Sequence, residues 1–90
     1  MSRVVAGDSR YELVVDGERV GVLDYEDDGD VVDLTHTEVE PRLRGSGLGE
    51  ELVRGALDDL RAQGRRIRPS CPFVAAFVRR HDEYGGLLDD

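Results

Sequence analysis

Three glycines that alternate with other residues are the first feature whose spacing suggests chemistry. Gly45, Gly47 and Gly49 lie directly before a periodic apolar segment, and Arg42 and Arg44 precede them. Glycine lets backbone amides approach an anion without a side chain in the way, and the amides at a helix start carry partial positive charge. The spacing therefore predicts a phosphate-binding loop with two arginines at its mouth; an ordinary flexible turn is the alternative.

Two common phosphate loops do not fit these residues. The Walker loop needs a Lys after its glycines, but all 12 basic residues of this chain are Arg. The dinucleotide fingerprint needs two residues before its third glycine and a full parallel sheet, whereas here the gap is one residue and the chain has 90 residues. Nucleotide hydrolysis and dinucleotide binding are therefore disfavoured.

The elements around the loop follow from hydrophobic patterning. Residues 10–15 and 19–25 are β-branched and aromatic-rich, and Asp16 and Gly17 between them predict a tight hairpin turn. The acidic cluster at 26–30 predicts a solvated loop. Residues 31–39 read as a third strand, with Val32, Leu34, His36 and Glu38 on one face by simple alternation.

The second half of the chain predicts two helices and one more strand. An apolar stripe from Leu48 to Leu60 has helical spacing, and Gly64 follows as a left-handed cap. Residues 65–70 predict a fourth strand, and Pro72 begins a second helix with Phe73 and Phe77 on one stripe. We expect a single α+β domain over 1–90, with a mostly antiparallel sheet, a central β-loop-α-β unit, two main helices and a loose tail at 82–90.

Composition limits the partners. The formal charge of -8 disfavours nucleic acid and anionic membranes. One Cys excludes an internal disulfide and a cysteine-based zinc site, and we expect no metal. The absence of a long apolar stretch makes the cytoplasm the simplest location. Nothing in the sequence indicates an oligomeric state.

The loop and three further motifs resemble a known family. Residues 42–47, Arg-Leu-Arg-Gly-Ser-Gly, resemble the Gln/Arg-x-x-Gly-x-Gly/Ala motif of the GNAT N-acetyltransferase superfamily. His-Thr-Glu-Val at 36–39, Cys-Pro-Phe at 71–73 and His-x-x-Tyr at 81–84 resemble its small stand-alone YjdJ-type branch. The resemblance spans roughly residues 9 to 84 and implies a GNAT-like fold that binds acetyl-CoA and acetylates an amine.

The resemblance also implies roles for residues of the strand end and the loop. The strand edge at Thr37, Glu38 and Val39 would pair with the pantetheine arm, and the Val39 amide would polarise the thioester carbonyl. The pyrophosphate would be held along the loop. The implied cofactor-binding residues are Thr37, Val39, Arg42, Leu43, Arg44, Gly45, Ser46, Gly47, Leu48 and Gly49.

Catalytic residues are less well marked. Glu38 is the first choice for the general base and His36 for a proton relay, while Cys71 at the second helix start would receive acetyl or protonate the leaving thiol. The alternatives are a solvated carboxylate, a structural histidine and a buried thiol. Tyr84 could supply the hydroxyl that family enzymes often carry elsewhere, or simply cap the core, and His81 reads as structural.

Two functions stay open at this point. One is acetyl transfer to an unidentified amine, and the other is a non-catalytic acyl-CoA-binding or protein-interaction module. The second is favoured by the short length and by Val78, which stands where family enzymes often carry a Tyr that acts as the general acid.

Overall fold

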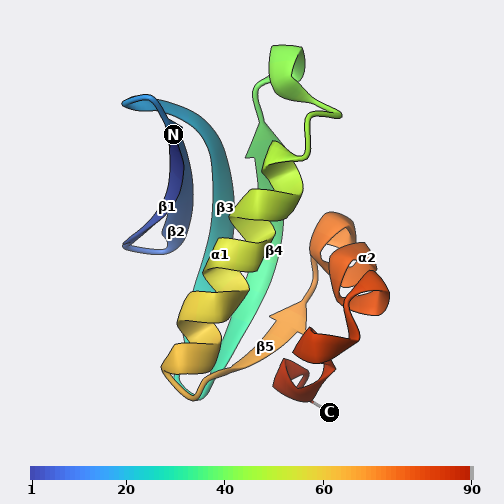
Figure 1. The fold of residues 1–90 in the computed structure, drawn as a ribbon. Coiled ribbons are helices and arrows are strands. Elements are labelled where there is room, and N and C mark those ends of the chain that lie inside the picture. Colours follow the sequence, from blue (N-terminus) through green and yellow to red (C-terminus); the bar gives the residue numbers. More distant parts are fainter. Residues whose placement is uncertain (90) are drawn as a thin grey trace.

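A five-stranded sheet with two helices on one face forms the structure, a computed structural model that describes residues 1–89 (Figure 1). Strands β1 to β4 are antiparallel neighbours in chain order, and β5 runs parallel to β4 at the far edge. The elements are β1 (Ser2–Gly7), β2 (Arg10–Val15), β3 (Glu18–Asp28), β4 (Val31–Val39), η1 (Pro41–Leu43), α1 (Leu48–Ala62), β5 (Arg66–Pro69), α2 (Pro72–Arg80) and η2 (Asp82–Leu87). The predicted α+β architecture with a central β-loop-α-β unit is confirmed.

Local turn chemistry explains the connections that were predicted. Asp16 and Gly17 have φ values of 50° and 84°, the left-handed pair that a two-residue hairpin turn requires. Gly64 ends α1 with φ 72°, as expected of a left-handed cap. No helix within residues 1–89 is long and apolar enough to span a membrane.

Two predictions about the strands are wrong. β1 was missed because its edge position leaves no buried face to impose alternation, and Ser9 rather than Gly takes the left-handed turn position at φ 61°. Residues 26–28 extend β3 instead of starting the loop, because they pair in register with residues 31–33 of β4. The exposed carboxylates of Asp27 and Asp28 also pair with Arg65 and Arg68.

The tail is also more ordered than expected. Residues 82–87 form the 3-10 helix η2, whose Tyr84 and Leu87 are buried, and Leu88 bridges to Ile67 of β5. These apolar side chains hold the segment against α1 and α2, so the expectation of a loose tail fails for the described part of 82–90.

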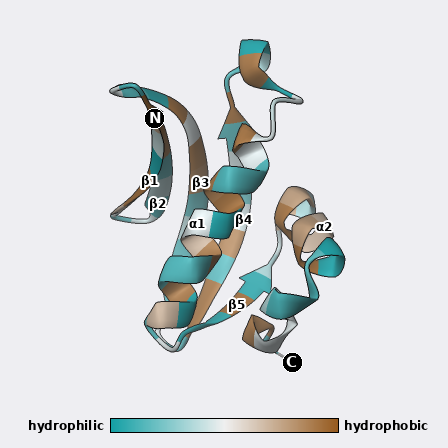
Figure 2. Cartoon of the chain, viewed as in Figure 1, coloured by the Kyte–Doolittle hydropathy of each residue, from teal (hydrophilic) through white to brown (hydrophobic). Residues whose placement is uncertain are grey.

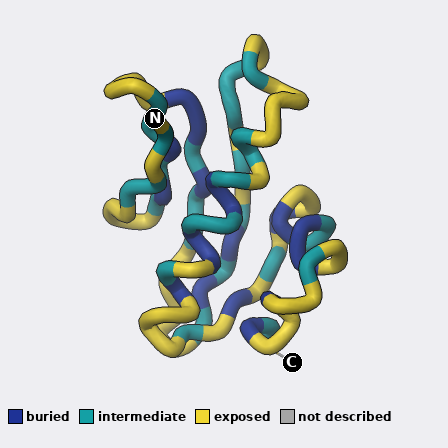
Figure 3. Tube along the Cα trace, viewed as in Figure 1, coloured by how far each residue is buried: buried dark blue, intermediate teal, exposed yellow. Residues whose placement is uncertain are grey.

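The hydrophobic core lies between the sheet and the helices. Buried residues occur along α1 and along the strands behind it (Figure 3), and apolar residues occur along the same elements (Figure 2). The predicted stripe of α1 is buried and packs on the apolar residues of β2, β3 and β4 in one cluster. Both helices join this cluster, so the second face of the sheet is left without a helix.

A bulge in β4 changes which residues face the helices. Asp24 pairs with His36 and Tyr25 with Leu34, so Thr35 is an extra residue between them. After the bulge Thr37, not His36, faces α2, and its hydroxyl lies 3.4 Å from the Cys71 sulfur. The prediction that His36 and Glu38 share a face with Val32 and Leu34 is therefore wrong, and the mixed polarity of both predicted faces has a physical cause.

Candidate functional site

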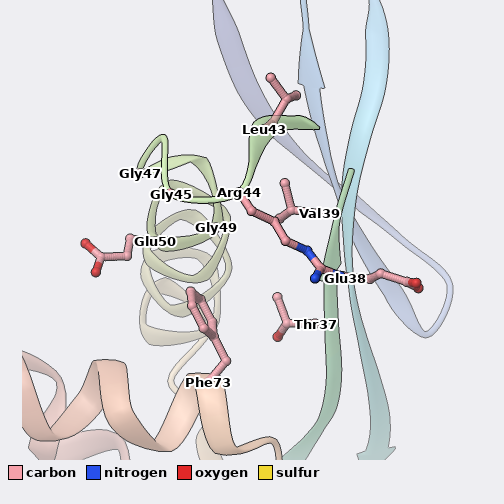
Figure 4. Close-up of a pocket in the computed structure, with 10 residues that line it drawn as sticks. All are labelled: Thr37, Glu38, Val39, Leu43, Arg44, Gly45, Gly47, Gly49, Glu50 and Phe73. Atoms are coloured by element: carbon pink, nitrogen blue, oxygen red, sulfur yellow. The ribbon is translucent and has the colours of Figure 1, made fainter. Parts of the chain in front are cut away.

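A cavity of about 550 Å³ opens where β4 ends and α1 begins (Figure 4). Its walls are the end of β4, the loop after η1, the first turn of α1 and the start of α2. The lining residues are Thr37, Glu38, Val39, Leu43, Arg44, Gly45, Gly47, Gly49, Glu50 and Phe73. The predicted loop thus forms one wall of this cavity.

The backbone of the loop has free hydrogen-bond donors. Gly45 and Gly47 have φ values of 82° and 89°, where an L side chain would be strained. Within residues 1–89, the structure shows no acceptor for the amides of Gly45, Gly47, Gly49 and Glu50. Since α1 is 15 residues long, its dipole adds positive potential at this point. The arrangement suits a multiply charged anion.

Three of the predicted cofactor-binding residues do not line the cavity. The Arg42 guanidinium pairs with Glu40 at 2.7 Å and Glu18 at 3.3 Å, which directs it away from the loop. The Ser46 hydroxyl bonds the Leu43 carbonyl and accepts from the Leu48 amide. Only Arg44 of the two arginines reaches the cavity, so the expectation of two cations at its mouth is wrong.

β4 presents a free backbone edge beside the cavity. β5 pairs with β4 only from Val31 to Leu34, and the Cys71 amide closes that ladder on the Leu34 carbonyl at 2.8 Å. The Glu40 amide donates to the Val20 carbonyl on β3 at 2.9 Å. Because backbone groups alternate sides along a strand, the amide and carbonyl of Val39 point the other way, toward the gap that β5 leaves.

Glu38 and His36 do not put their side chains into this cavity. Figure 4 shows the Glu38 carboxylate pointing away from Thr37 and Phe73. It lies on the other sheet face, 3.5 Å from the His36 imidazole, and the two side chains are 66% and 60% exposed. The predicted base and relay are therefore together, but across the sheet from the cavity.

Cys71 is buried behind the cavity rather than in its wall. It is 5% exposed, and its sulfur contacts the Thr37 hydroxyl, which does line the cavity. A reagent in the cavity would meet Thr37 first. The buried-thiol alternative describes its position in this structure.

His81 and Tyr84 do not line the cavity and belong to a cluster around Arg54. The Arg54 guanidinium lies 5.3 Å from the Phe77 ring centre and 3.5 Å from His81 Nδ1. The Tyr84 hydroxyl donates to Asp58 at 2.7 Å, and burial followed by this hydrogen bond raises the pKa of Tyr84. The cluster holds the C-terminal segment against α1. This is the structural role given above as an alternative for Tyr84 and as the reading of His81.

Phe73 and Glu50 were not predicted as site residues. Phe73 was assigned to the core with Phe77, yet it is 40% exposed, whereas Phe77 is fully buried. A Cβ on Gly49 would come within 3.0 Å of its ring, so Gly49 and Phe73 set the width of the cavity. Phe73 follows Pro72 directly in the first helical turn, and this position was the available indication that it would lie at the open end.

A family model described as GCN5-related N-acetyl-transferase matches residues 10–87, most of the chain. The chain belongs to the GCN5-related N-acetyltransferase family. The cavity thus lies in a GCN5-related fold, and the matched range contains the whole β4, loop and α1 unit.

Individual relatives agree with this family. Protein NATD1 from Bos taurus is 38% identical over 51 residues, which are 57% of this chain and 45% of that protein, so the match covers less than half of the curated relative. A GCN5-like protein from Staphylococcus aureus superposes with a TM-score of 0.74 at 20% identity, covering 97% of this chain and 87% of that chain.

An N-acetylglutamate synthase from Neisseria gonorrhoeae, solved in complex with coenzyme A, superposes with a TM-score of 0.61 at 22% identity and covers 80% of this chain and 18% of that chain. At such identities the two solved structures support the GCN5-related fold alone.

Proposed function

We propose that this chain binds acetyl-CoA in the cavity at the start of α1 and transfers the acetyl group to an amine, as a member of the YjdJ-type branch acting in the cytoplasm. The observation that carries the proposal is that the amides of Gly45, Gly47, Gly49 and Glu50, which border a cavity of about 550 Å³, have no acceptor among residues 1–89. Membership of the GCN5-related family supports the same ligand.

The residues present fit the pyrophosphate and the pantetheine arm of coenzyme A. Positive φ at Gly45 and Gly47 turns successive amides toward one point, as a diphosphate requires. The free edge of Val39 can exchange hydrogen bonds with an amide-containing arm, and the Phe73 ring supplies an apolar wall. Arg44 also lines the cavity and adds positive potential there.

One negative charge opposes the pyrophosphate and is compensated. Glu50 lies in the first turn of α1, where a carboxylate competes with an anion for the helix dipole. Its carboxylate pairs with Arg80 of α2 at 2.7 Å, and Figure 4 shows it turned away from Gly49 and Phe73. The ion pair leaves the amides free for a ligand.

Bound acetyl-CoA would supply a thioester carbonyl that an amine can attack. The Val39 amide is placed to stabilise negative charge on that carbonyl oxygen, a role that needs no side chain. Glu38 would take the amine proton from the other sheet face, with His36 at 3.5 Å to pass it to solvent. The Cys71 sulfur does not line the cavity and contacts it through Thr37, so no step of the transfer is assigned to it.

Transfer is tested by incubating the chain with acetyl-CoA and a panel of amines while released thiol is measured. We expect thiol release that requires an amine, and Glu38→Gln should lower kcat about 100-fold or more, the usual worth of a general base, while CoA affinity stays within twofold. Cys71→Ala should retain transfer. Equal rates for wild type and Glu38→Gln would remove Glu38 from the mechanism.

A non-catalytic acyl-CoA-binding module is the second candidate. The observation that favours it is that no acid or base points into the cavity: Glu38 and Glu50, the lining carboxylates, both turn away from it. If acetyl-CoA raises the melting temperature but no amine, peptide or thiol receives acetyl, this second function is correct.

A further inference from the structure

A second hollow lies on the sheet face that carries no helix. Its volume is about 340 Å³, and it lies over the ends of β2, β3 and β4. The lining residues are Arg10, Arg19, Val20, Gly21, Val22, Glu38, Val39, Glu40, Pro41 and Arg44. Glu38, Val39 and Arg44 also line the first cavity, so the two hollows meet at the end of β4.

Most charges around this second hollow are already neutralised within the protein. Arg10 bonds Asp24 at 2.6 Å, an interaction that raises the pKa of Arg10, and Arg19 bonds Glu12 at 3.2 Å. Glu40 bonds Arg42 at 2.7 Å. The first two pairs join β2 to β3, and in each of the three pairs the opposite charges offset one another.

Two opposite charges remain. Within the part of the chain that the structure describes, the Arg44 guanidinium forms no ion pair. Among residues 1–89 the ion-pair partner of Glu38 is His36, at 3.5 Å, and that pairing requires a protonated imidazole. The hollow therefore offers one carboxylate, of Glu38, before Val39 in the chain and one guanidinium, of Arg44, after it.

We propose that this second hollow binds the acceptor, and that the acceptor is a small zwitterion, a primary amine with a carboxylate a few atoms away. The inference rests on the proposed acetyl transfer and names its substrate class. Glu38 would accept hydrogen bonds from the ammonium, and the planar Arg44 guanidinium would take the carboxylate through two parallel bonds. A polyamine would instead place extra cations beside three guanidinium groups.

The position of Glu38 then gains a reason. The acceptor ammonium first gives one proton to the Glu38 carboxylate. The amine nitrogen forms a bond to the acetyl carbon as the carbon–sulfur bond breaks, and the second amine proton ends on the departing sulfur as a thiol. A base on the helix-free face suits an acceptor that approaches from that face, opposite the cavity proposed for acetyl-CoA.

The size of the hollow limits the acceptor. About 340 Å³ lies at the lower end for small-molecule sites, which suits an amino acid or the terminal residue of a peptide. Both sources present the same chemistry, since a peptide that begins with Asp or Glu also carries a carboxylate close to its amine. The experiment separates these sources.

Three compounds with one carbon skeleton test the proposal: β-alanine with amine and carboxylate, propylamine without the carboxylate, and propionate without the amine. With acetyl-CoA present, we expect kcat/KM for β-alanine to exceed that for propylamine at least tenfold, because a site built for a carboxylate rejects an analogue that lacks it. Propionate should not be acetylated. Peptides that begin with Asp or with Asn form the second arm and show whether a peptide can replace the free amino acid.

Matched variants locate the effect. Arg44→Gln should reduce the ratio of the two rates to about one, and the ratio is independent of any change in acetyl-CoA affinity. Arg10→Gln, which removes a guanidinium already paired with Asp24, should leave the ratio above about fivefold. Should Arg44→Gln leave the wild-type ratio unchanged, Arg44 does not bind the carboxylate and the inference is wrong.

The outcomes distinguish this inference from the proposed function. If CoA binds and propylamine reacts as fast as β-alanine, only the substrate class is wrong. If no amine is acetylated, titration of the labelled protein with β-alanine decides: shifts of the Val22 and Glu38 amides that propylamine does not cause support the binding site, and unmoved amides overturn it. Failure of CoA itself to bind would remove the proposed function.

Discussion

The two halves of α1 are built on different principles. At its start, the atoms available to a ligand are backbone amides from Gly45 to Glu50, and two glycines there have open space where a Cβ would be. Farther along α1, aromatic rings, guanidinium groups and carboxylates contact one another, as where Arg61 lies 4.8 Å from the Tyr84 ring centre. The first half is suited to binding and the second to stability.

This difference explains why the side chains that stand out in the sequence do not lie in the proposed binding region. The His81 and Tyr84 motif holds η2 against α1, whereas the proposed binding region has few side chains to notice. Substitutions in the first half should change ligand affinity through backbone conformation. Substitutions in the second should change stability and leave affinity alone, and each prediction below tests one side of this contrast.

The largest effect is expected when a glycine at each end of α1 is replaced by alanine. Gly47 and Gly64 both have positive φ and free space for a Cβ, so each Ala costs about 1–2 kcal/mol of backbone strain. Gly47→Ala should lower CoA affinity roughly tenfold, because relief of that strain turns the amides away. Gly64→Ala should lower the melting temperature about as much as Gly47→Ala does. It should change CoA affinity, measured by calorimetric titration, less than twofold. Equal affinities for both variants would contradict a backbone-built site.

The next effect concerns the second half of α1. Tyr84→Phe removes the hydroxyl that donates to Asp58 and should cost about 1 kcal/mol, which is a melting-temperature drop of about 4–8 °C for a domain of this size. CoA affinity should not change. Tyr25→Phe is the control, since its hydroxyl bonds the Gly7 carbonyl at the surface. A loss of CoA affinity in Tyr84→Phe would place that residue in the binding region after all.

The stability should depend on pH through a tyrosine of β2 that bonds the second half of α1. Burial, and then a 2.7 Å hydrogen bond to Asp59, raise the pKa of Tyr11 above its ordinary value of 10.0. A raised pKa means that the folded state keeps a proton that the unfolded state loses, so stability is intact below about pH 10 and falls as pH rises beyond it. Urea unfolding from pH 9 to 11 should show a shallower decline for Tyr11→Phe than for wild type. Identical slopes would contradict this assignment.

The smallest effect returns to the binding half. Glu50→Gln removes the carboxylate that competes for the start of α1, and we expect CoA affinity to rise about twofold at low salt. The gain should disappear at high ionic strength, because the group is exposed. Glu51→Gln is the control in the same turn, since Glu51 bonds Ser2 of β1 and does not line the cavity. Weaker CoA binding by Glu50→Gln would contradict a phosphate at this helix start.

Local chemistry accounts for what the sequence predicted well. The hairpin at Asp16 and Gly17, the cap at Gly64 and the glycine loop all depend on which residues tolerate positive φ, and that property belongs to single residues. The apolar stripe of α1 was equally clear because one helix face meets one sheet.

Features that depend on pairing between distant segments were not predictable in the same way. The bulge at Thr35 is defined by its register against β3, and it reverses the faces of His36 and Glu38. Arg42 was placed at the loop mouth, but Glu18 and Glu40 bind it, and Glu18 is far away in the sequence. Phe73 has a core-like residue type, and its place beside the cavity depends on its packing against Gly49, which is far away in the sequence.

Titration of isotope-labelled protein with coenzyme A tests the central claim most directly, through the glycine amide resonances. The resonances of Gly45, Gly47 and Gly49 should shift progressively and saturate. Those of Gly17 and Gly64, which also have positive φ but do not line the cavity, should stay in place. Saturating shifts confined to the first three glycines are the predicted result. If these three resonances stay fixed while coenzyme A is raised to millimolar concentration, the loop does not bind the pyrophosphate.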